Sequence, residues 1–297
     1  MKDVVIFLLV ILFVASCGDG EDNYSYLSQP DVQAETATIK FETASNQSLF
    51  EYTLQAKEMV IDWGDGSPLG EYMFFGDIRE TDSIKALSYT YTNPGAYDIK
   101  VKALQLRALL LSGSGDNSIS ELILTDCNRL RKLYCEDQPL TELDMKDCRE
   151  LRVLSCGSSQ QELTLNNLSV PLKLGELYIN GPLSSGDLDL SMNDSIRILE
   201  LRKTNLTFIQ LGGLPELRSV NFEACPGLTN IYLGENSLLS EVILTNNTSL
   251  DAGALNDLFE GLPQTSDDDR RYITLSGNKG DDLCNKNIAL SKGWSFR

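Results

Sequence analysis

The sequence contains no histidine. This absence excludes every nucleophile system that uses histidine as its base, and it excludes every metal site that needs an imidazole ligand. Positive charge is also scarce, because 25 lysines and arginines stand against 43 aspartates and glutamates and give a formal net charge of −18. Such an acidic chain repels nucleic acid and anionic membranes, so we expect no nucleic-acid partner, and polyanion binding could come only from a local basic cluster.

No apolar run is long enough to span a bilayer, since the longest extends only from Val4 to Val14. The run follows one lysine and precedes small residues, which is typical of an export signal. The ending Val14-Ala15-Ser16-Cys17 resembles the lipobox of bacterial lipoproteins, which implies cleavage before Cys17 and acylation of that cysteine. Each buried methylene of an acyl chain contributes about 0.8 kcal/mol to membrane binding. We therefore predict a signal peptide over residues 1–17 and an exported protein that is lipid-anchored to the outer membrane at the cell surface. A plain secretory signal with a chance cysteine is the alternative.

The next part of the chain changes from an aperiodic to an alternating pattern. Residues 18–34 are polar and aperiodic, which predicts a flexible tether. Over residues 35–104, short runs of alternating apolar and polar residues are separated by turn formers, which indicates antiparallel strands. The run Trp63-Gly64-Asp65-Gly66-Ser67, followed by Tyr89-Thr90-Tyr91, Gly95 and Tyr97, resembles a PKD-type immunoglobulin-like domain. The resemblance implies a small β-sandwich over residues 35–104 that serves as a spacer or an adhesion element.

The WGDG stretch also has a purely structural interpretation. Asp65-Gly66 supplies the backbone freedom of a tight turn, and Trp63 is large enough to anchor a small core. Asp62 and Asp65 fall short of the six to eight oxygens that calcium prefers, so we predict no metal there.

Beyond Leu106 the pattern L-x-x-L-x-L recurs, with steps of nine to eleven residues except for one longer step between positions 160 and 174. Such recurrence predicts a solenoid, because one short unit can bury its apolar face only against its neighbours. The signature resembles the short bacterial leucine-rich repeat of about 21 residues per coil, which implies parallel strands over residues 105–252. Residues 253–297 are predicted to form a C-terminal cap with one helix, one strand, and Trp294 and Phe296 as covers. The predicted fold is therefore mainly β. The aligned blocks start at positions 119, 130, 140, 151, 160, 174, 185, 196, 206, 217, 228 and 239.

The cysteines fall at fixed positions of the repeat. Cys127, Cys148 and Cys225 lie eight residues after a block start, and Cys135 and Cys156 occupy the third inward strand position. We predict that all five are interior, and the leucine-rich-repeat resemblance implies that cysteine or asparagine at the turn satisfies neighbouring backbone groups. A coil spacing of about 4.8 Å would permit bridges from Cys127 to Cys148 and from Cys135 to Cys156, but Cys225 has no stacked partner. We favour free thiols over one or two bridges, and both over a four-sulfur zinc site.

Candidate functional residues lie at outward positions, since inward positions are used for packing. On one side of the coil Arg131, Arg152, Arg197 and Arg218 form a column, interrupted by Gly175, and Tyr134 and Tyr178 lie near it. Stacked arginines beside aromatic rings suit carboxylate, sulfate or phosphate groups. The alternative is a solvated repeat surface, in which the arginines pair with nearby acids. Those acids are Glu150, Glu200 and Glu216, and a second, acidic column on the other side contains Glu121, Glu142, Glu162 and Asp187.

The leading functional hypothesis is a non-catalytic recognition or adhesion lipoprotein that binds a protein or glycan ligand, such as an anionic or host-derived one, without a cofactor. A glycan- or nutrient-binding lipoprotein of an uptake system is the alternative, and it requires clustered aromatics, whereas Tyr134, Tyr178, Phe208 and Tyr232 look scattered. A glycosidase could use Asp187 and Asp189, whose α-carbons would be about 6.7 Å apart on one strand face. A flat, solvated strand lacks the apolar pocket that raises a carboxyl pKa, so we predict no catalytic residue. The run Asp267 to Asp269 is interpreted as a solvated loop.

Overall fold

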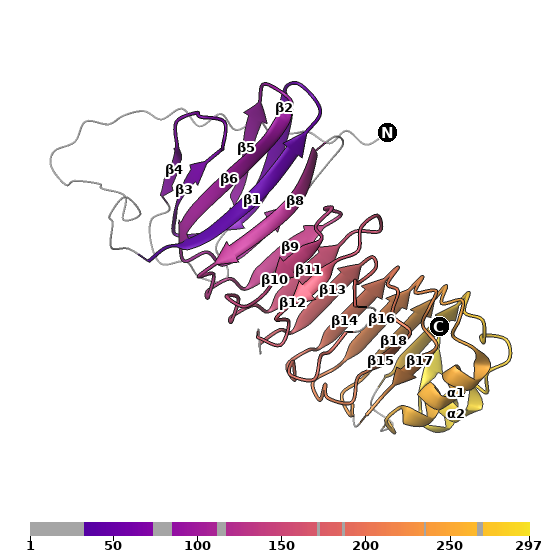
Figure 1. The fold of residues 1–297 in the computed structure, drawn as a ribbon. Coiled ribbons are helices and arrows are strands. Elements are labelled where there is room, and N and C mark those ends of the chain that lie inside the picture. Colours follow the sequence, from indigo (N-terminus) through magenta and orange to yellow (C-terminus); the bar gives the residue numbers. More distant parts are fainter. Residues whose placement is uncertain are drawn as a thin grey trace, which may run out of the picture.

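The computed structural model describes residues 33–73, 85–111, 117–170, 173–185, 188–234, 236–265 and 270–297. Cys17, the predicted signal peptide, most of the predicted tether, Asp187 and the run 267–269 lie outside the described residues. The fold is mainly β and contains a β-solenoid of about eight turns, which confirms the predicted class at that level. The molecule is elongated: the N-terminal strands lie at one end of the stacked coils and two short helices lie at the other (Figure 1).

The strands between residues 35 and 104 lie in two sheets that face each other. Alternation of apolar and polar residues produces the alternating burial of their strands. Phe41 of one sheet packs against Phe50 and Tyr91 of the other, with ring centroids 4.7 Å and 5.1 Å apart. The strands are β1 (Glu35–Thr43), β2 (Ser48–Gln55), β3 (Glu58–Asp62), β4 (Gly70–Met73), β5 (Lys85–Tyr91) and β6 (Gly95–Leu104), and the first sheet has the order β4-β3-β6-β1-β8.

The WGDG stretch forms the predicted turn and core anchor. Trp63 is buried and stacks on the ring of Tyr89 at 4.3 Å, and the Tyr89 hydroxyl donates to Asp65 Oδ2 at 2.6 Å. Gly64 and Gly66 have φ of +77° and +80°, which only glycine adopts without strain. The carboxylates of Asp62 and Asp65 each accept a backbone N–H two residues further on, so both cap the turn.

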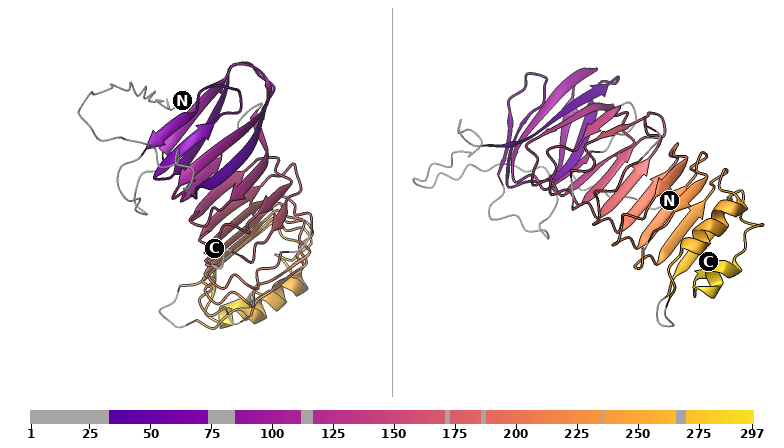
Figure 2. Two further views of the ribbon diagram at one scale, coloured as in Figure 1. Left: turned by 60° about the vertical axis from the view of Figure 1, so that its left-hand side comes forward. Right: turned by 60° about the horizontal axis from the view of Figure 1, so that its bottom comes forward.

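The solenoid places parallel strands side by side along one face. Together with β2 and β5 they form one eleven-stranded sheet, called the long sheet here (Figure 2). Each strand is about 21 to 23 residues from the next through the middle of the stack, as the register of Cys135 with Cys156 and of Leu199 with Val220 shows. The parallel strands are β7 (Ala108–Leu111), β9 (Lys132–Glu136), β11 (Val153–Gly157), β13 (Glu176–Asn180), β14 (Ile198–Arg202), β16 (Ser219–Glu223), β18 (Glu241–Thr245), β19 (Tyr272–Ser276) and β20 (Ser295–Phe296).

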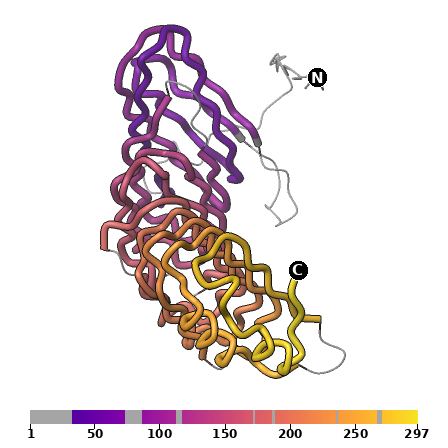
Figure 3. Tube along the Cα trace, turned by 90° about the vertical axis from the view of Figure 1, so that its right-hand side faces the viewer, coloured from indigo at the N-terminus to yellow at the C-terminus, as the bar shows by residue number. Residues whose placement is uncertain are grey.

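The opposite side of the coils, called the broken side here, has shorter strands and two separate two-stranded sheets. One sheet pairs β10 with β12 and the other pairs β15 with β17. Figure 3, viewed from the C-terminal end, shows the successive coils lying one behind another. The strands on this side are β8 (Asn117–Thr125), β10 (Glu142–Asp144), β12 (Thr164–Asn166), β15 (Phe208–Gln210) and β17 (Asn230–Tyr232).

Hydrogen bonding continues from the N-terminal strands into the solenoid. β7 pairs with β2 in antiparallel fashion and with β9 in parallel fashion, so the long sheet passes through the junction near residue 104. β8 likewise pairs with β1 over eight residue pairs. Both parts contribute to one cluster of buried apolar side chains, so the N-terminal strands cover the first coil of the solenoid.

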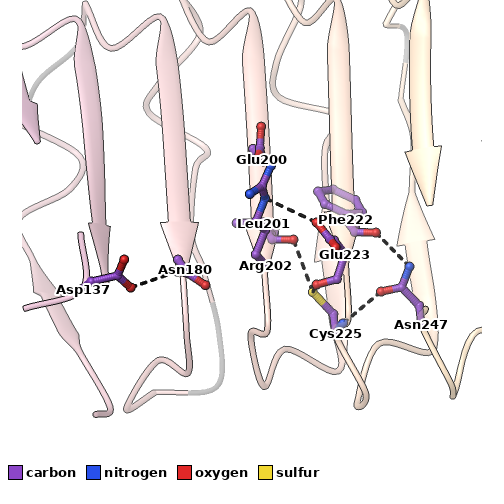
Figure 4. Close-up of polar contacts among 9 residues, drawn as sticks. All are labelled: Asp137, Asn180, Glu200, Leu201, Arg202, Phe222, Glu223, Cys225 and Asn247. Atoms are coloured by element: carbon purple, nitrogen blue, oxygen red, sulfur yellow. Dashed lines mark hydrogen bonds and ion pairs between the residues drawn. The ribbon is translucent and has the colours of Figure 1, made fainter. Parts of the chain in front are cut away.

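The five solenoid cysteines are buried and carry free thiols, as favoured from the sequence. Burial raises the pKa of the Cys135 thiol to about 12 and holds it in the neutral form at physiological pH. Cys225 donates its thiol hydrogen to the carbonyl oxygen of Leu201 in the previous coil at 3.5 Å. Asn247, at the same position one coil later, donates to Phe222 O at 2.9 Å and accepts from the Cys225 N–H at 3.0 Å (Figure 4). The predicted turn role of cysteine and asparagine is therefore confirmed at these two positions.

The C-terminal segment covers the last coil. α1 (Ala252–Gly261) begins after Asp251, whose side chain accepts from the Ala254 N–H, and α2 (Asn287–Ser291) packs against α1. Trp294 is buried and donates from Nε1 to Pro263 O at 2.9 Å, which confirms its predicted place as a cover. Among the residues that the structure describes, no helix has the length and apolar character needed to cross a bilayer.

Candidate functional site

The four predicted arginines lie in one column that crosses the strands of the long sheet just before their N-terminal ends. Each precedes a strand by one residue, and backbone hydrogen bonds connect them from coil to coil. The Arg152 N–H donates to Arg131 O at 2.8 Å, the Gly175 N–H to Arg152 O at 2.8 Å, and the Arg197 N–H to Gly175 O at 2.7 Å. The Arg218 N–H donates to Arg197 O at 2.9 Å. The register read from the repeat therefore places these residues as neighbours.

The column is longer than the sequence indicated. The Arg131 N–H donates to Arg107 O at 2.8 Å, so Arg107 precedes the column, while Ser240 follows Arg218, as the repeat alignment predicts. Arg271 follows at the far end and donates from Nη1 to Leu239 O at 2.8 Å. Arg107 lies one residue after Leu106, ahead of the first aligned block, and Arg271 lies beyond the helix, which is why the repeat alignment omitted both.

The two halves of the column have different electrostatic surroundings. Near Arg131 and Arg152, the Glu150 carboxylate accepts a hydrogen bond from Lys173 at 2.6 Å. This bond, reinforced by the two arginines, lowers the Glu150 pKa below its ordinary value. Arg197 and Arg218 are exposed, and no ion pair among the described residues involves either of them.

The alternative pairing of the arginine column with Glu200 is wrong in the structure. Glu200 pairs with Arg202 at the opposite end of the same strand, and Arg202 Nε also lies 3.5 Å from Glu223 on β16 (Figure 4). The Arg197 guanidinium instead lies over Gly175, where an added β-carbon would be 3.2 Å from Nη2. The missing side chain at Gly175 thus leaves the space that Arg197 occupies.

Tyr134 and Tyr178 lie on the outward face of the long sheet, on either side of Ser155. They belong to β9 and β13, and Ser155 of β11 pairs with both in register. Ser155 is only 3 % exposed because a tyrosine flanks it on each side, and its hydroxyl donates to Glu136. The Tyr178 hydroxyl donates to Glu176 at 3.0 Å, and burial together with this bond raises the Tyr178 pKa to about 12. Both rings are half-buried and held in place.

Two buried amide oxygens on this face have no hydrogen-bond donor among the described residues. Asn180 donates from Nδ2 to Asp137 across the intervening strand at 3.3 Å (Figure 4). Its Oδ1 accepts no hydrogen bond from the described residues, and neither does Oδ1 of Asn221. Gly157 lies between Asp137 and Asn180 and lets their side chains meet. Buried polar atoms normally have a partner, so each oxygen is an acceptor for water or for a ligand group.

The predicted acidic column belongs to the broken side and is paired locally. Glu121 forms an ion pair with Lys40 of β1, and Glu142 accepts a hydrogen bond from the Asn166 amide. Glu162 is exposed, and Asp187 lies outside the described residues. These contacts match a solvated repeat surface.

The broken side also carries a hollow of about 490 Å³, which sequence analysis missed. Asp189 lies on its rim, but hydrogen bonds from the backbone and side chain of Ser191 lower the Asp189 pKa, so this carboxyl is ionised. A general acid in glycoside hydrolysis needs the opposite shift. The hollow is lined by Leu163, Thr164, Leu165, Asn166, Asn167, Leu168, Ser169, Leu183, Ser185, Leu188 and Asp189.

The aromatic side chains are less scattered than the sequence suggested. Phe208 and Tyr232 are 24 positions apart, but β15 and β17 bring them together, with ring centroids 6.3 Å apart in an edge-to-face arrangement. Both remain about half exposed. Two of the four aromatic residues therefore form a pair, whereas Tyr134 and Tyr178 lie apart from them on the long sheet.

Within the described ranges, no three histidine, cysteine, aspartate or glutamate side chains gather in a way that could hold a metal ion. A scan against models of known protein families and a search of curated proteins both returned no match for this chain.

Proposed function

We propose that the chain is an exported, non-catalytic recognition protein. It binds a protein or glycan ligand through the outward face of the long sheet and the arginine column beside it. The arginine column carries this proposal, because four guanidinium groups follow one another along the stack in a chain with a formal net charge of −18. On so acidic a chain, a surface that binds no ligand would not be expected to gather its arginines in one column.

The geometry of the column suits an extended anionic ligand. Arg131 and Arg152 occupy adjacent coils, Gly175 takes the place of an arginine in the next coil, and Arg197 and Arg218 occupy the two coils after it. Adjacent coils are about 4.8 Å apart, so each pair can contact neighbouring carboxylate or sulfate groups. Arg197 and Arg218 are exposed and form no ion pair among the described residues. A ligand therefore does not have to displace an intramolecular partner from them.

The remaining parts of the chain have proposed roles in presenting this face. Cys17 is proposed as the lipid attachment residue, residues 18–34 as the tether, and residues 35–104 as a PKD-like spacer. The coils of residues 105–252 are proposed to be leucine-rich repeats. The protein is then held at the outer membrane by its acyl chains, with the binding face directed away from the bilayer.

Binding by the arginine column is tested with heparin, chondroitin sulfate and polyglutamate as probes, and neutral dextran as the reference. Arg152→Glu with Arg197→Glu should weaken binding of the anionic probes about 100-fold or more, since each charged hydrogen bond contributes about 1.5–3 kcal/mol. The matched control is Lys100→Glu with Lys102→Glu, two exposed positions on β6 with the same change of charge. An equal loss of affinity in both double variants would mean that only the net charge matters. Unchanged binding in the arginine double variant would refute the arginine column as the binding site.

The proposed anchor is tested separately, with a palmitate analogue that labels acylated cysteine in growing cells. Cys17→Ala should abolish the label and release the protein from the membrane fraction. Protease treatment of intact cells should digest the wild-type protein if it faces outward. Labelling that persists without Cys17 would contradict the anchor while leaving the binding face untouched.

A role in glycan or nutrient uptake is the second candidate, favoured by the exposed pair of Phe208 and Tyr232. Exposed aromatic rings that meet at a surface are typical of ligand contacts. This aromatic pair lies on the broken side of the coils, away from the arginine column.

A further inference from the structure

The hollow on the broken side occupies a break in the strand stack. β10 pairs with β12, and β15 pairs with β17, but the described part of the coil between these sheets contributes only the isolated bridge of Leu163 with Leu183. The break coincides with the one long step of the repeat, between positions 160 and 174. Extra residues in that step displace the coil from the regular ladder, and the hollow of about 490 Å³ lies beside it.

The lining of the hollow combines an aliphatic floor with a neutral polar rim. Five leucines form the floor, and hydroxyl and amide groups form most of the rim. Among the described residues that line it there is no lysine or arginine, and Asp189 is the one carboxylate. The floor is formed by Leu163, Leu165, Leu168, Leu183 and Leu188, and the rim by Thr164, Asn166, Asn167, Ser169, Ser185 and Asp189.

Hydrogen bonds hold the rim side chains in place. The Thr164 hydroxyl donates to Ser184 Oγ at 2.8 Å, and the Asn167 amide donates to Asp144 at 2.8 Å. The Asn166 amide donates to Glu142. Both asparagines use their side-chain nitrogen in these contacts, which leaves the side-chain oxygen of each as the acceptor for a ligand hydroxyl. A rim with fixed side chains loses little conformational entropy when a ligand binds.

A second, smaller hollow extends the first toward the aromatic pair. It has a volume of about 80 Å³, shares Leu188 and Asp189 with the larger hollow, and is lined at its other end by Gln210. Gln210 and Phe208 lie on the same outward face of β15, and Phe208 contacts Tyr232. The two hollows and the ring pair therefore form one track across successive coils, and the exposed Met192 follows Ser191 at its margin.

We propose that this track binds a neutral oligosaccharide. Sugar rings present C–H faces that pack on leucine and aromatic side chains, and they present hydroxyls that donate to amide and carboxylate oxygens. The absence of lysine and arginine from the described lining gives no partner for sulfated or carboxylated sugars. An extended peptide is disfavoured because the side chains of Asn166, Ser185 and Gln210 form the rim and would meet its backbone only at irregular intervals. The site is independent of the arginine column, which lies on the opposite side of the coils.

The test uses the full chain as the expressing cell processes it, purified in a detergent without a sugar headgroup. The probes are linear neutral hexasaccharides of glucose, xylose and mannose with different linkages, measured by calorimetry and by saturation-transfer NMR. At least one hexasaccharide should bind in the micromolar to millimolar range. Phe208→Ala with Tyr232→Ala should weaken that binding about tenfold or more, since each aromatic contact contributes about 0.5–1.5 kcal/mol.

Two further variants separate the site from general damage to the fold. Ser185→Trp fills the hollow from an exposed position and should abolish binding, whereas Leu290→Ala, an exposed apolar position on the cap, should leave it unchanged. Arg152→Glu with Arg197→Glu should also leave it unchanged, even if those changes remove anionic ligands.

The proposal is overturned if none of the hexasaccharides binds at 10 mM, a concentration chosen as roughly ten times a weak Kd of about 1 mM. It is equally overturned if binding persists in both the aromatic double variant and Ser185→Trp. Selection of peptides that lose affinity for Ser185→Trp, when no sugar binds, would reassign the track to an extended peptide.

Discussion

Replacing Asn247 by alanine gives the sharpest test of how the coils are held together. Asn247 is fully buried, donates to the Phe222 carbonyl oxygen at 2.9 Å and accepts from the Cys225 N–H at 3.0 Å. It also donates to Asn278 Oδ1 at 3.0 Å, so it connects three successive coils. Alanine would leave two backbone groups buried without partners. Each such group costs about 1–3 kcal/mol, so we expect a loss of about 2–6 kcal/mol in the free energy of unfolding.

The measurement is urea unfolding followed by circular dichroism, combined with hydrogen exchange of the amides in β16 and β18. The measurement includes the turn after β16, where exchange should accelerate first at Cys225, whose N–H loses its acceptor. The matched control is Asn128→Ala, an exposed asparagine whose amide makes a weak contact at 3.4 Å, and this change should cost less than about 0.5 kcal/mol. A loss below about 1 kcal/mol for Asn247→Ala would refute the role of the turn ladder in stability.

Four other predictions concern strained or buried positions. Gly157→Ala should destabilise the protein by several degrees in its melting temperature, because φ is +98° and the new β-carbon would lie 2.6 Å from Asn180 O. Lys203→Gly should raise the unfolding free energy by up to about 1 kcal/mol, since Lys203 has φ of +53°; a decrease would show that the lysine side chain outweighs the strain. In the folded protein at pH 8, a thiol reagent should modify the half-exposed Cys284 first and leave Cys135 unmodified, as mass spectrometry of the labelled peptides would show. Because burial raises the pKa of Cys135 from 9.0 to about 12, the folded state holds that proton more tightly than the unfolded state. Stability contributed by the neutral thiol is therefore complete below pH 9 and should be lost between pH 9 and about 12; melting temperatures that stay level across this interval would contradict the burial.

The repeat could be predicted from the sequence because the inward positions are set by a local rule. Leu217, Val220 and Phe222 follow the pattern of one coil, and all are buried. The same rule fixes which residues are neighbours between coils, so the repeat alone places Arg152 and Arg197 in one column. Position in the repeat therefore carries structural information even for exposed side chains.

The features that could not be predicted depend on contacts outside the repeat. The pairing of β7 with β2, and of β8 with β1, joins segments about 55 to 90 positions apart that share no sequence signal. The contact between Phe208 and Tyr232 is diagonal across two strands, which a column-by-column reading does not show. The hollow lies where strand pairing is interrupted on the broken side. The leucine pattern predicts the regular coils, but it does not predict the shape of the chain at such an interruption.

The long sheet runs from β5 at the N-terminal end to β20 at the C-terminal end without an open edge between coils. We expect a sheet with this continuity to resist bending at the junction, and the reach of the molecule to depend on the number of coils. Each additional coil would lengthen it by about 4.8 Å at a cost of about 21 residues. Gain or loss of whole coils in the middle of the stack is therefore a simple route by which the distance between anchor and far end could change while both ends keep their own closing strands.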